Sequence, residues 1–294
     1  MASTITLRRK IKATISTKQI TRAMQMVAAS KMHRAQEAVK KSRDYSDKAA
    51  EVLRNLSADA SLAEHPLLTK RSGARVVLLL LSSDRGLCGA LNAQTFRVLM
   101  DYLNEHKHET IQIVTSGRKA EEFSKRYLAS VKMPNVHVGA CFNGFPDKPT
   151  IDHVKPFSQL TVNPYVTNQI DRLDILSSKF VSTLVQKPTL KTLLPITVPQ
   201  SETKSENSAI EFLFEPSKSE VIDKIVPALI NSQLYQIFLD QIACEHSARM
   251  VAMKNATENA AEVIDELKQK YNSARQSKIT AEIAEVTAGA AALS

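Results

Sequence analysis

The positions of helix-breaking residues divide this chain into three parts. All eleven prolines lie between Pro66 and Pro227, and six of the seven glycines lie between Gly73 and Gly144. The segments Met1–Leu56 and Ala228–Ala288 contain neither residue type and are rich in Ala, Lys, Arg, Gln and Met, which favour helices. Each segment predicts a helix of about 55 to 60 residues, which at 1.5 Å per residue is about 80 to 90 Å long.

Apolar residues recur at steps of three and four along both segments, so each helix needs a partner for one face. Both helices leave the middle of the chain, near Leu56 and Pro227, so the simplest packing is antiparallel, with about the last ten residues projecting alone. Periodicity alone favours a long helical hairpin inside a bundle, and this alternative stays open. The predicted stripes are Ile20, Met24, Val27, Ala28, Met32, Ala35, Val39, Tyr45, Ala49, Val52 and Leu56, and Ile230, Leu234, Ile237, Ala248, Val251, Ala256, Ala260, Val263, Leu267 and Ala274.

The middle of the chain has a different pattern, in which short apolar runs alternate with amphipathic segments. This order predicts a small sheet with helices against it. We therefore predict an α+β protein, in which the termini form a long antiparallel α-helical coiled coil and a central α/β, Rossmann-like domain lies between them. The domains are 1–60, 72–216 and 217–294. The expected strands are Val76–Leu81, Ile111–Thr115, Val136–Val138, Leu173–Phe180 and Glu211–Phe214, the helices Ala93–Asn104 and Arg118–Ser130, and the loops Asn143–Pro149 and Gln200–Ser208.

Positive charge is concentrated in the first helix. Residues 1–57 hold 13 basic and 4 acidic side chains, a net +9 that equals the formal charge of the whole chain, whereas residues 228–294 hold 6 basic and 8 acidic ones. Such a helix attracts an acidic protein surface, nucleic acid or anionic lipid, or is simply a solvated face. Charge alone does not choose among these.

Membrane and disulfide signals are weak. The longest apolar run, Val76–Leu81, is far shorter than the roughly 18 residues of a membrane span, and the start of the chain lacks the apolar region of a signal peptide. The three cysteines, Cys88, Cys141 and Cys244, are too few and scattered for a disulfide framework, which favours a reducing compartment.

The only candidate ligand loop is Ser82–Gly89, which reads SSDRGLCG and follows the first strand. It matches neither phosphate-loop pattern, so we interpret it as a tight turn, with Cys88 as a small packing residue. The seven histidines have no metal spacing and are expected at the surface. No catalytic, metal or cofactor residue can be nominated.

Several blocks resemble the γ subunit of F-type ATP synthases, most closely the bacterial ones. They are the opening segment from Ile11 to Gln36 with TKQITRAMQMVAASKMHRAQ, the segment SSDRGLCGALN ending at Asn92, and Glu245–Ala260, reading EHSARMVAMKNATENA. The end of the chain matches the family's signature, and the resemblance is collinear over the whole length. The matching signature residues are Ile279, Thr280, Glu282, Glu285, Gly289, Ala290 and Ala292.

This resemblance implies a rotor shaft that couples proton or ion flow to ATP synthesis and is not itself an enzyme. It implies α and β subunits of a catalytic hexamer, the ε subunit and the c-subunit ring as partners, no cofactor, and a peripheral place on the cytoplasmic face of the bacterial plasma (inner) membrane. Position by position, it implies hexamer contacts at Met24 and Arg249, and further ones at Arg275, Gln276, Thr280 and Glu282. Phe212 and Phe214 lie where the family's foot contacts ε and the ring, although aromatic alcohols are common there in relatives.

Two other classes of function compete with this interpretation. A nucleic-acid-binding hairpin would use the basic first helix, but Trp is absent as a base-stacking platform and no binding motif is recognised. An α/β enzyme with helical arms would need a catalytic constellation, and none is found.

Overall fold

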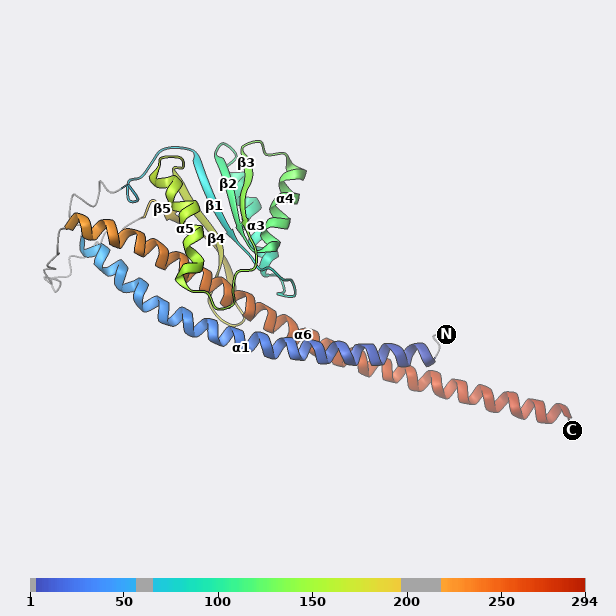
Figure 1. Ribbon diagram of the computed structural model, residues 1–294. Helices are drawn as coiled ribbons and strands as arrows, with labels where there is room; N and C mark the ends of the chain where they lie inside the picture. The colour runs from blue at the N-terminus through green and yellow to red at the C-terminus, as the bar shows by residue number, and fades with distance from the viewer. Residues whose placement is uncertain (1–3, 57–65, 197–217, 294) are drawn as a thin grey trace. The chain divides into compact units, whose positions relative to one another are not determined.

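The computed structural model describes residues 4–56, 66–196 and 218–293. Two very long helices, α1 (Thr4–Leu56) and α6 (Lys218–Leu293), lie at the two ends of the chain, and an α/β domain lies between them in sequence (Figure 1). The first long helix therefore agrees with the sequence prediction over its described residues. The predicted strand Glu211–Phe214 and the predicted loop Gln200–Ser208 lie outside the described residues.

A five-stranded sheet in the order β3-β2-β1-β4-β5 forms the centre of the α/β domain. The strands β1 (Arg75–Leu81), β2 (Thr110–Ser116), β3 (Val136–Phe142) and β4 (Arg172–Phe180) run parallel, and β5 (Gln186–Leu194) is antiparallel to β4. The four parallel strands cover the predicted strands of this region. A continuous apolar strand such as β1 is buried on both faces, as a central parallel strand must be.

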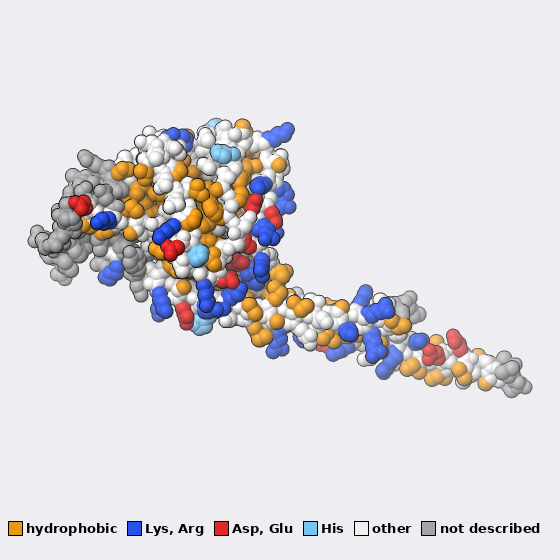
Figure 2. Space-filling model, viewed as in Figure 1, with side chains coloured by type: hydrophobic (Ala, Val, Ile, Leu, Met, Phe, Trp, Pro, Cys, Tyr) orange, Lys and Arg blue, Asp and Glu red, His pale blue; other side chains and the backbone are white. Residues whose placement is uncertain are grey.

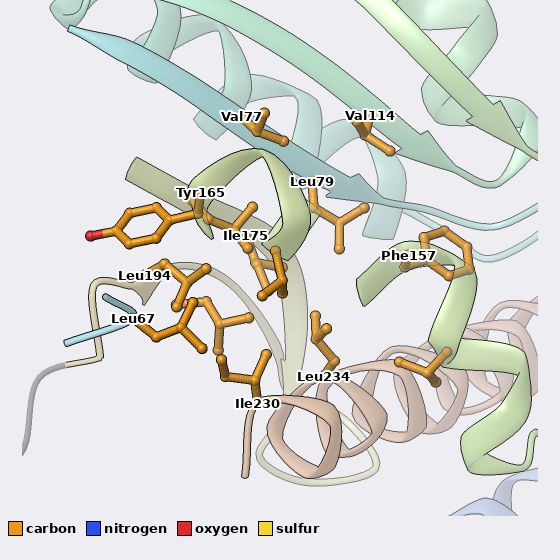
Figure 3. Packing of buried hydrophobic residues seen from close by; sticks show 14 of the residues in the cluster. Leu67, Val77, Leu79, Val114, Phe157, Tyr165, Ile175, Leu194, Ile230 and Leu234 are labelled. Atoms are coloured by element: carbon orange, nitrogen blue, oxygen red, sulfur yellow. The ribbon is translucent and has the colours of Figure 1, made fainter. Parts of the chain in front are cut away.

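Alternate side chains of β1 point to opposite faces of the sheet and belong to two separate cores. Val77 and Leu79 face one core, covered by α5 (Ile151–Val166) and the first part of α6, whereas Leu78 faces the other, covered by α3 (Leu91–Glu105) and α4 (Arg118–Val131). Figure 3 shows the first core, where Leu79 of the sheet points toward Leu234 of α6. The domain is therefore a three-layer α/β/α sandwich.

Two elements were missed by the sequence analysis because each contains proline. Helix α5 includes Pro156 and Pro164, which interrupt the helical pattern, yet Val154, Phe157 and Tyr165 are buried against the sheet. Strand β5 includes Pro188, which is tolerated because β5 is an edge strand.

The second long helix begins before the proline-free segment Ala228–Ala288 that predicted it. It begins at Lys218, next to the predicted domain boundary at 217, and runs through Pro227. Proline removes one backbone hydrogen bond from a helix. Val226, Leu229 and Ile230 are buried in the first core, and their packing outweighs this loss.

The predicted stripe of α1 was partly wrong. Ile20 and Val27 are exposed, at 60% and 56%, whereas Leu7, Thr21 and Ala28 are buried. Leu7, Thr21, Ala28 and Ala35 follow a seven-residue spacing. Ala28, Ala35 and Val39 of the predicted stripe are buried as expected, whereas Leu7 and Thr21 were not in it. On α6, Val263 is likewise exposed and the neighbouring Ile264 is buried.

The chain separates into two compact units. One consists of residues 1–29 and 249–294, and the other of residues 30–248. Within the first unit, the hydroxyl of Thr257 donates a hydrogen bond of 2.8 Å to the hydroxyl of Thr21. The second unit contains the sandwich and the adjoining parts of both long helices.

Candidate functional site

The loop after β1 occupies the place where parallel α/β folds bind ligands, at the carboxyl ends of the strands. There Asp84 accepts hydrogen bonds from the backbone N–H groups of Arg118, at 3.0 Å, and Gly144, at 2.9 Å. The hydroxyl of Ser82 accepts a bond of 2.7 Å from the N–H of Ala120. The chain's own side chains therefore take up the amide donors at the start of α4 that a phosphate would otherwise use.

The rest of the same loop is closed by side-chain hydrogen bonds. Asn92 donates to the hydroxyl of Ser83 at 2.7 Å and to the sulfur of Cys88 at 3.3 Å. Cys88 is buried in a cluster with Leu91 and Cys244, which agrees with its interpretation as a packing residue. Burial raises the pKa of the Cys244 thiol far above its ordinary value, so this thiol stays protonated. The loop is a packed turn, not a reactive centre.

Metal-ligating side chains do not gather in the described part of the chain. Across residues 4–56, 66–196 and 218–293, no group of three or more His, Cys, Asp or Glu side chains could hold a metal ion. One histidine differs from the expectation that all lie at the surface: His246 of α6 is only 4% exposed. Its Nε2 lies 3.1 Å from a carboxylate oxygen of Asp147.

Asp147 is a site residue that the sequence analysis missed. It lies in the loop between β3 and α5 and also accepts a hydrogen bond of 2.5 Å from Lys31 of α1. Burial alone would raise the pKa of Asp147, but the hydrogen bond from Lys31 and the charge of His246 outweigh burial, so the pKa lies below its usual range. Three residues separated by about a hundred positions or more cannot be associated from sequence spacing, so no local signal marked this contact.

The structure places the predicted hexamer contacts on both long helices of the first unit. Met24 of α1 and Arg249 of α6 are half-buried. Arg275, Gln276 and Glu282 lie on a stretch of α6 in which every residue from 275 to 291 is exposed. Thr280 donates a hydrogen bond to the carbonyl of Gln276 at 3.0 Å, and Glu282 pairs with Lys278 at 3.4 Å. These polar contacts stay within the helix, so the outer surface is available to a partner.

The signature residues of the chain's end also belong to this exposed stretch. Ile279 is 45% exposed, and a Cβ added at Gly289 would meet no atom within 4 Å. Glu285 and Ala290 are exposed, and Ala292 lies in the last turn of α6. Phe212 and Phe214, the predicted foot contacts, lie outside the described residues.

Comparison with known proteins identifies the family. A family model described as ATP synthase matches residues 3–293. The chain is 39% identical over its whole length to the ATP synthase gamma chain of Nitrosococcus oceani, which it covers completely. The chain belongs to the ATP synthase gamma chain family. It is also 40% identical to the gamma chain of Coxiella burnetii, with 98% of each chain covered, and 37% identical to that of Legionella pneumophila over the full length of both.

Solved structures share the fold of this gamma-chain family member. A chain from the Euglena gracilis mitochondrial ATP synthase, in a structure of OSCP/F1/c-ring in rotational state 3, is similar with a TM-score of 0.65 at 18% identity, covering 99% of this chain and 94% of that one. A chain from the central stalk/c-ring of the Tetrahymena thermophila mitochondrial enzyme has a TM-score of 0.60 at 19% identity, covering 81% and 99%.

The basic surface of this gamma-chain family member belongs to its first long helix, because residues 1–57 hold 13 basic and 4 acidic side chains. Figure 2 shows Lys and Arg side chains distributed along the unit formed by the helix ends, on the face in view. Within the described residues, no helix is long and apolar enough to cross a membrane. The SSDRGLCG block, one of the segments that resemble the family, forms the closed turn between β1 and α3.

Proposed function

We propose that this chain is the central rotor shaft of an ATP synthase and couples ion flow through a c-subunit ring to ATP synthesis or hydrolysis on the β subunits. The observation that carries the proposal is the match to ATP synthase gamma chains over the full length of the chain. The chain is a non-catalytic subunit. Its partners are the α and β subunits, the ε subunit and the ring, and it associates with the membrane through them.

The shaft itself is an antiparallel coiled coil of α1 and α6. The hydrogen bond between Thr21 and Thr257 supports this pairing, and so does the seven-residue spacing of buried positions on α1. Two antiparallel helices rise equally per residue and run in opposite directions. If Thr21 of α1 is level with Thr257 of α6, Thr4 is therefore level with Ala274. Exposure without interruption from Arg275 to Ala291 agrees with this count. The domain boundaries are 1–60, 72–216 and 217–294.

The end of α6 is the part that enters the hexamer. Its exposed side chains include Ile279, Ile283 and Val286, which are 45%, 58% and 72% exposed. Exposed apolar residues on a lone helix favour burial in an apolar sleeve. Arg275, Gln276, Thr280 and Glu282 contact the hexamer there, Met24 and Arg249 contact it lower on the shaft, and Phe212 and Phe214 contact ε and the ring.

Rotation follows from asymmetry. A curved, off-axis shaft cannot contact three identical β subunits equally, so each β is biased toward a different conformation. Coupling between shaft angle and nucleotide affinity is reciprocal, so hydrolysis drives rotation and forced rotation drives ATP release. The complex is peripheral on the cytoplasmic face of the bacterial inner membrane. No observation favours the nucleic-acid-binding hairpin.

A disulfide cross-link tests rotation. Arg34 is exposed on α1, whereas the nearby Lys31 is engaged by Asp147, so Arg34 is the better position for a cysteine. Arg34→Cys is paired with a cysteine in the facing loop of β, and oxidation is expected to stop steady-state ATP hydrolysis until reductant is added. Arg34→Cys without its β partner is the control and stays active. Undiminished turnover at complete cross-linking contradicts a rotating shaft.

A further inference from the structure

We propose that Asp147 is a positioning residue that sets the axial register of α1 against α6, by binding one cationic or N–H-bearing side chain from each helix. This inference rests on the proposed function, since register matters because the two helices form the shaft. All residues of the contact belong to the unit of residues 30–248.

The geometry assigns one carboxylate oxygen to each helix. Oδ2 of Asp147 accepts a hydrogen bond from Nζ of Lys31 on α1, and Oδ1 lies 3.1 Å from Nε2 of His246 on α6. A carboxylate accepts hydrogen bonds and donates none, so Nε2 of His246 carries the proton. The side chains of His246, Lys31 and Asp147 are 5%, 34% and 51% exposed, so the contact is shielded from water at His246 and partly open to water at the carboxylate.

The loop that carries Asp147 is itself fixed to the sandwich, which makes the carboxylate a stable reference point. At its start, the N–H of Gly144 donates to Asp84 at 2.9 Å. In its middle, the ring of Phe145 stacks on that of Phe238 of α6 at 4.4 Å. At its end, the hydroxyl of Tyr235 donates to the carbonyl of Pro149 at 3.2 Å.

The apolar contact between the helices near Asp147 is small. The cluster there contains Ala35 of α1 with Ile242 and Ala243 of α6, and Phe145 and Phe180 pack against it. Where the apolar contact between two helices is small, a polar pair can specify their alignment. Asp147 supplies a polar contact to both helices at once.

Register has a direct consequence for the shaft. A slip of α1 by one helical turn, about 5.4 Å, would move its outward residues relative to those of α6 and change which side chains each β subunit meets. A one-turn slip is a discrete change and can be measured as a second state.

Paired spin labels test the proposal in the assembled complex. Labels are attached at Arg34→Cys on α1 and Lys224→Cys on α6, both exposed, after the native cysteines have been replaced by serine. Lys224 lies far along α6 from His246, so the distance between labels responds to axial slip. The unaltered Asp147 gives one narrow distance, and Asp147→Ala adds a second, shifted by about 5 Å.

The matched control is Asp152→Ala. Asp152 is an exposed aspartate five residues away that pairs with Lys155 of its own helix, and its loss leaves one distance. Lys31→Asp alone is expected to add the second distance, because two carboxylates repel each other. Lys31→Asp combined with Asp147→Lys restores the single one, with the proton of His246 moved to Nδ1 so that Nε2 accepts a hydrogen bond from the new ammonium. A purely structural role of Asp147 would not allow this rescue by charge exchange.

Two outcomes overturn the proposal: one unshifted distance in Asp147→Ala, or a second distance that appears equally in Asp152→Ala. ATP-driven proton pumping is measured on the same complexes. Asp147→Ala is expected to hydrolyse ATP with fewer protons moved per ATP. If the unaltered complex pumps neither protons nor sodium ions, the proposed function fails, whereas the distances report on register independently of it.

Discussion

The hydroxyl of Tyr102 on α3 donates a hydrogen bond of 2.6 Å to a carboxylate oxygen of Asp174 on β4. Asp174 is 2% exposed, and it also accepts hydrogen bonds from Arg172, at 2.7 Å, and from Thr192 of β5, at 2.7 Å. Arg172 reaches Glu109 in turn, at 2.6 Å. A buried carboxylate with several donors ties a helix to two strands, because leaving any of its partners unpaired is costly.

Tyr102→Phe is expected to lower the free energy of unfolding of the full chain by about 1 to 3 kcal/mol, because it leaves a buried, charged acceptor with one donor fewer. Urea unfolding measures the change. Tyr127→Phe is the control, since the Tyr127 ring stacks on Phe123 at 5.7 Å and keeps this contact without its hydroxyl. Equal losses in both variants would contradict a special role for the bond to Asp174.

The same pair predicts a dependence on alkaline pH. Burial, and then the hydrogen bond and charge of Asp174, raise the pKa of Tyr102 well above its ordinary value. Above about pH 10 the unfolded chain loses the phenolic proton while the folded chain keeps it, so the stability of the folded state falls as pH rises. Tyr102→Phe lacks this loss, and the gap in stability between the two proteins therefore narrows above pH 10. A gap that stays constant from pH 8 to 11 would contradict the prediction.

Two glycines with positive φ offer a matched pair of alanine substitutions. Gly117 has φ +101, and a Cβ there would lie 2.3 Å from the carbonyl oxygen of Ser82, whereas Gly144 has φ +77 with no atom within 4 Å of such a Cβ. Gly144→Ala is expected to cost about 1 to 2 kcal/mol of backbone strain. Gly117→Ala costs more, because strain and the clash add. Thermal unfolding compares the stabilities of the two variants. A larger loss of stability in Gly144→Ala than in Gly117→Ala would contradict the prediction.

The three thiols are expected to react at different rates with a maleimide under native conditions. Cys141 is half-exposed on the edge strand β3, whereas Cys88 and Cys244 are buried, and burial raises the pKa of the Cys244 thiol. Mass spectrometry should find Cys141 modified first and Cys244 modified only on unfolding. Cys141→Ser removes the fast phase. Early modification of Cys244 would show that its cluster opens in the native protein.

Sequence reasoning located the long helices and the parallel strands because their signals are local. The absence of Gly and Pro marked α1 over its described length, and β1 was evident as a continuous apolar run. Proline concealed α5 and β5, since their stability comes from burial against the sheet and not from local preference. The contact of Asp147 with Lys31 and His246 could not be predicted, because only the folded domain brings these residues together. The family resemblance nominated the contacts on the shaft, which residue patterns alone would not have identified.

Helix α1 carries several of its large apolar side chains on its exposed face. Thr21 and Ala28 are buried, whereas Ile20, Met26 and Val27 face outward. Exposed apolar side chains favour association until a partner buries them, so the chain alone is expected to aggregate more readily than its net charge suggests. Solubility then becomes a property of the assembled complex. When more of this chain is made than its partners can cover, the excess is expected to precipitate or be degraded. The exposed apolar face of one helix therefore requires balanced synthesis of the subunits.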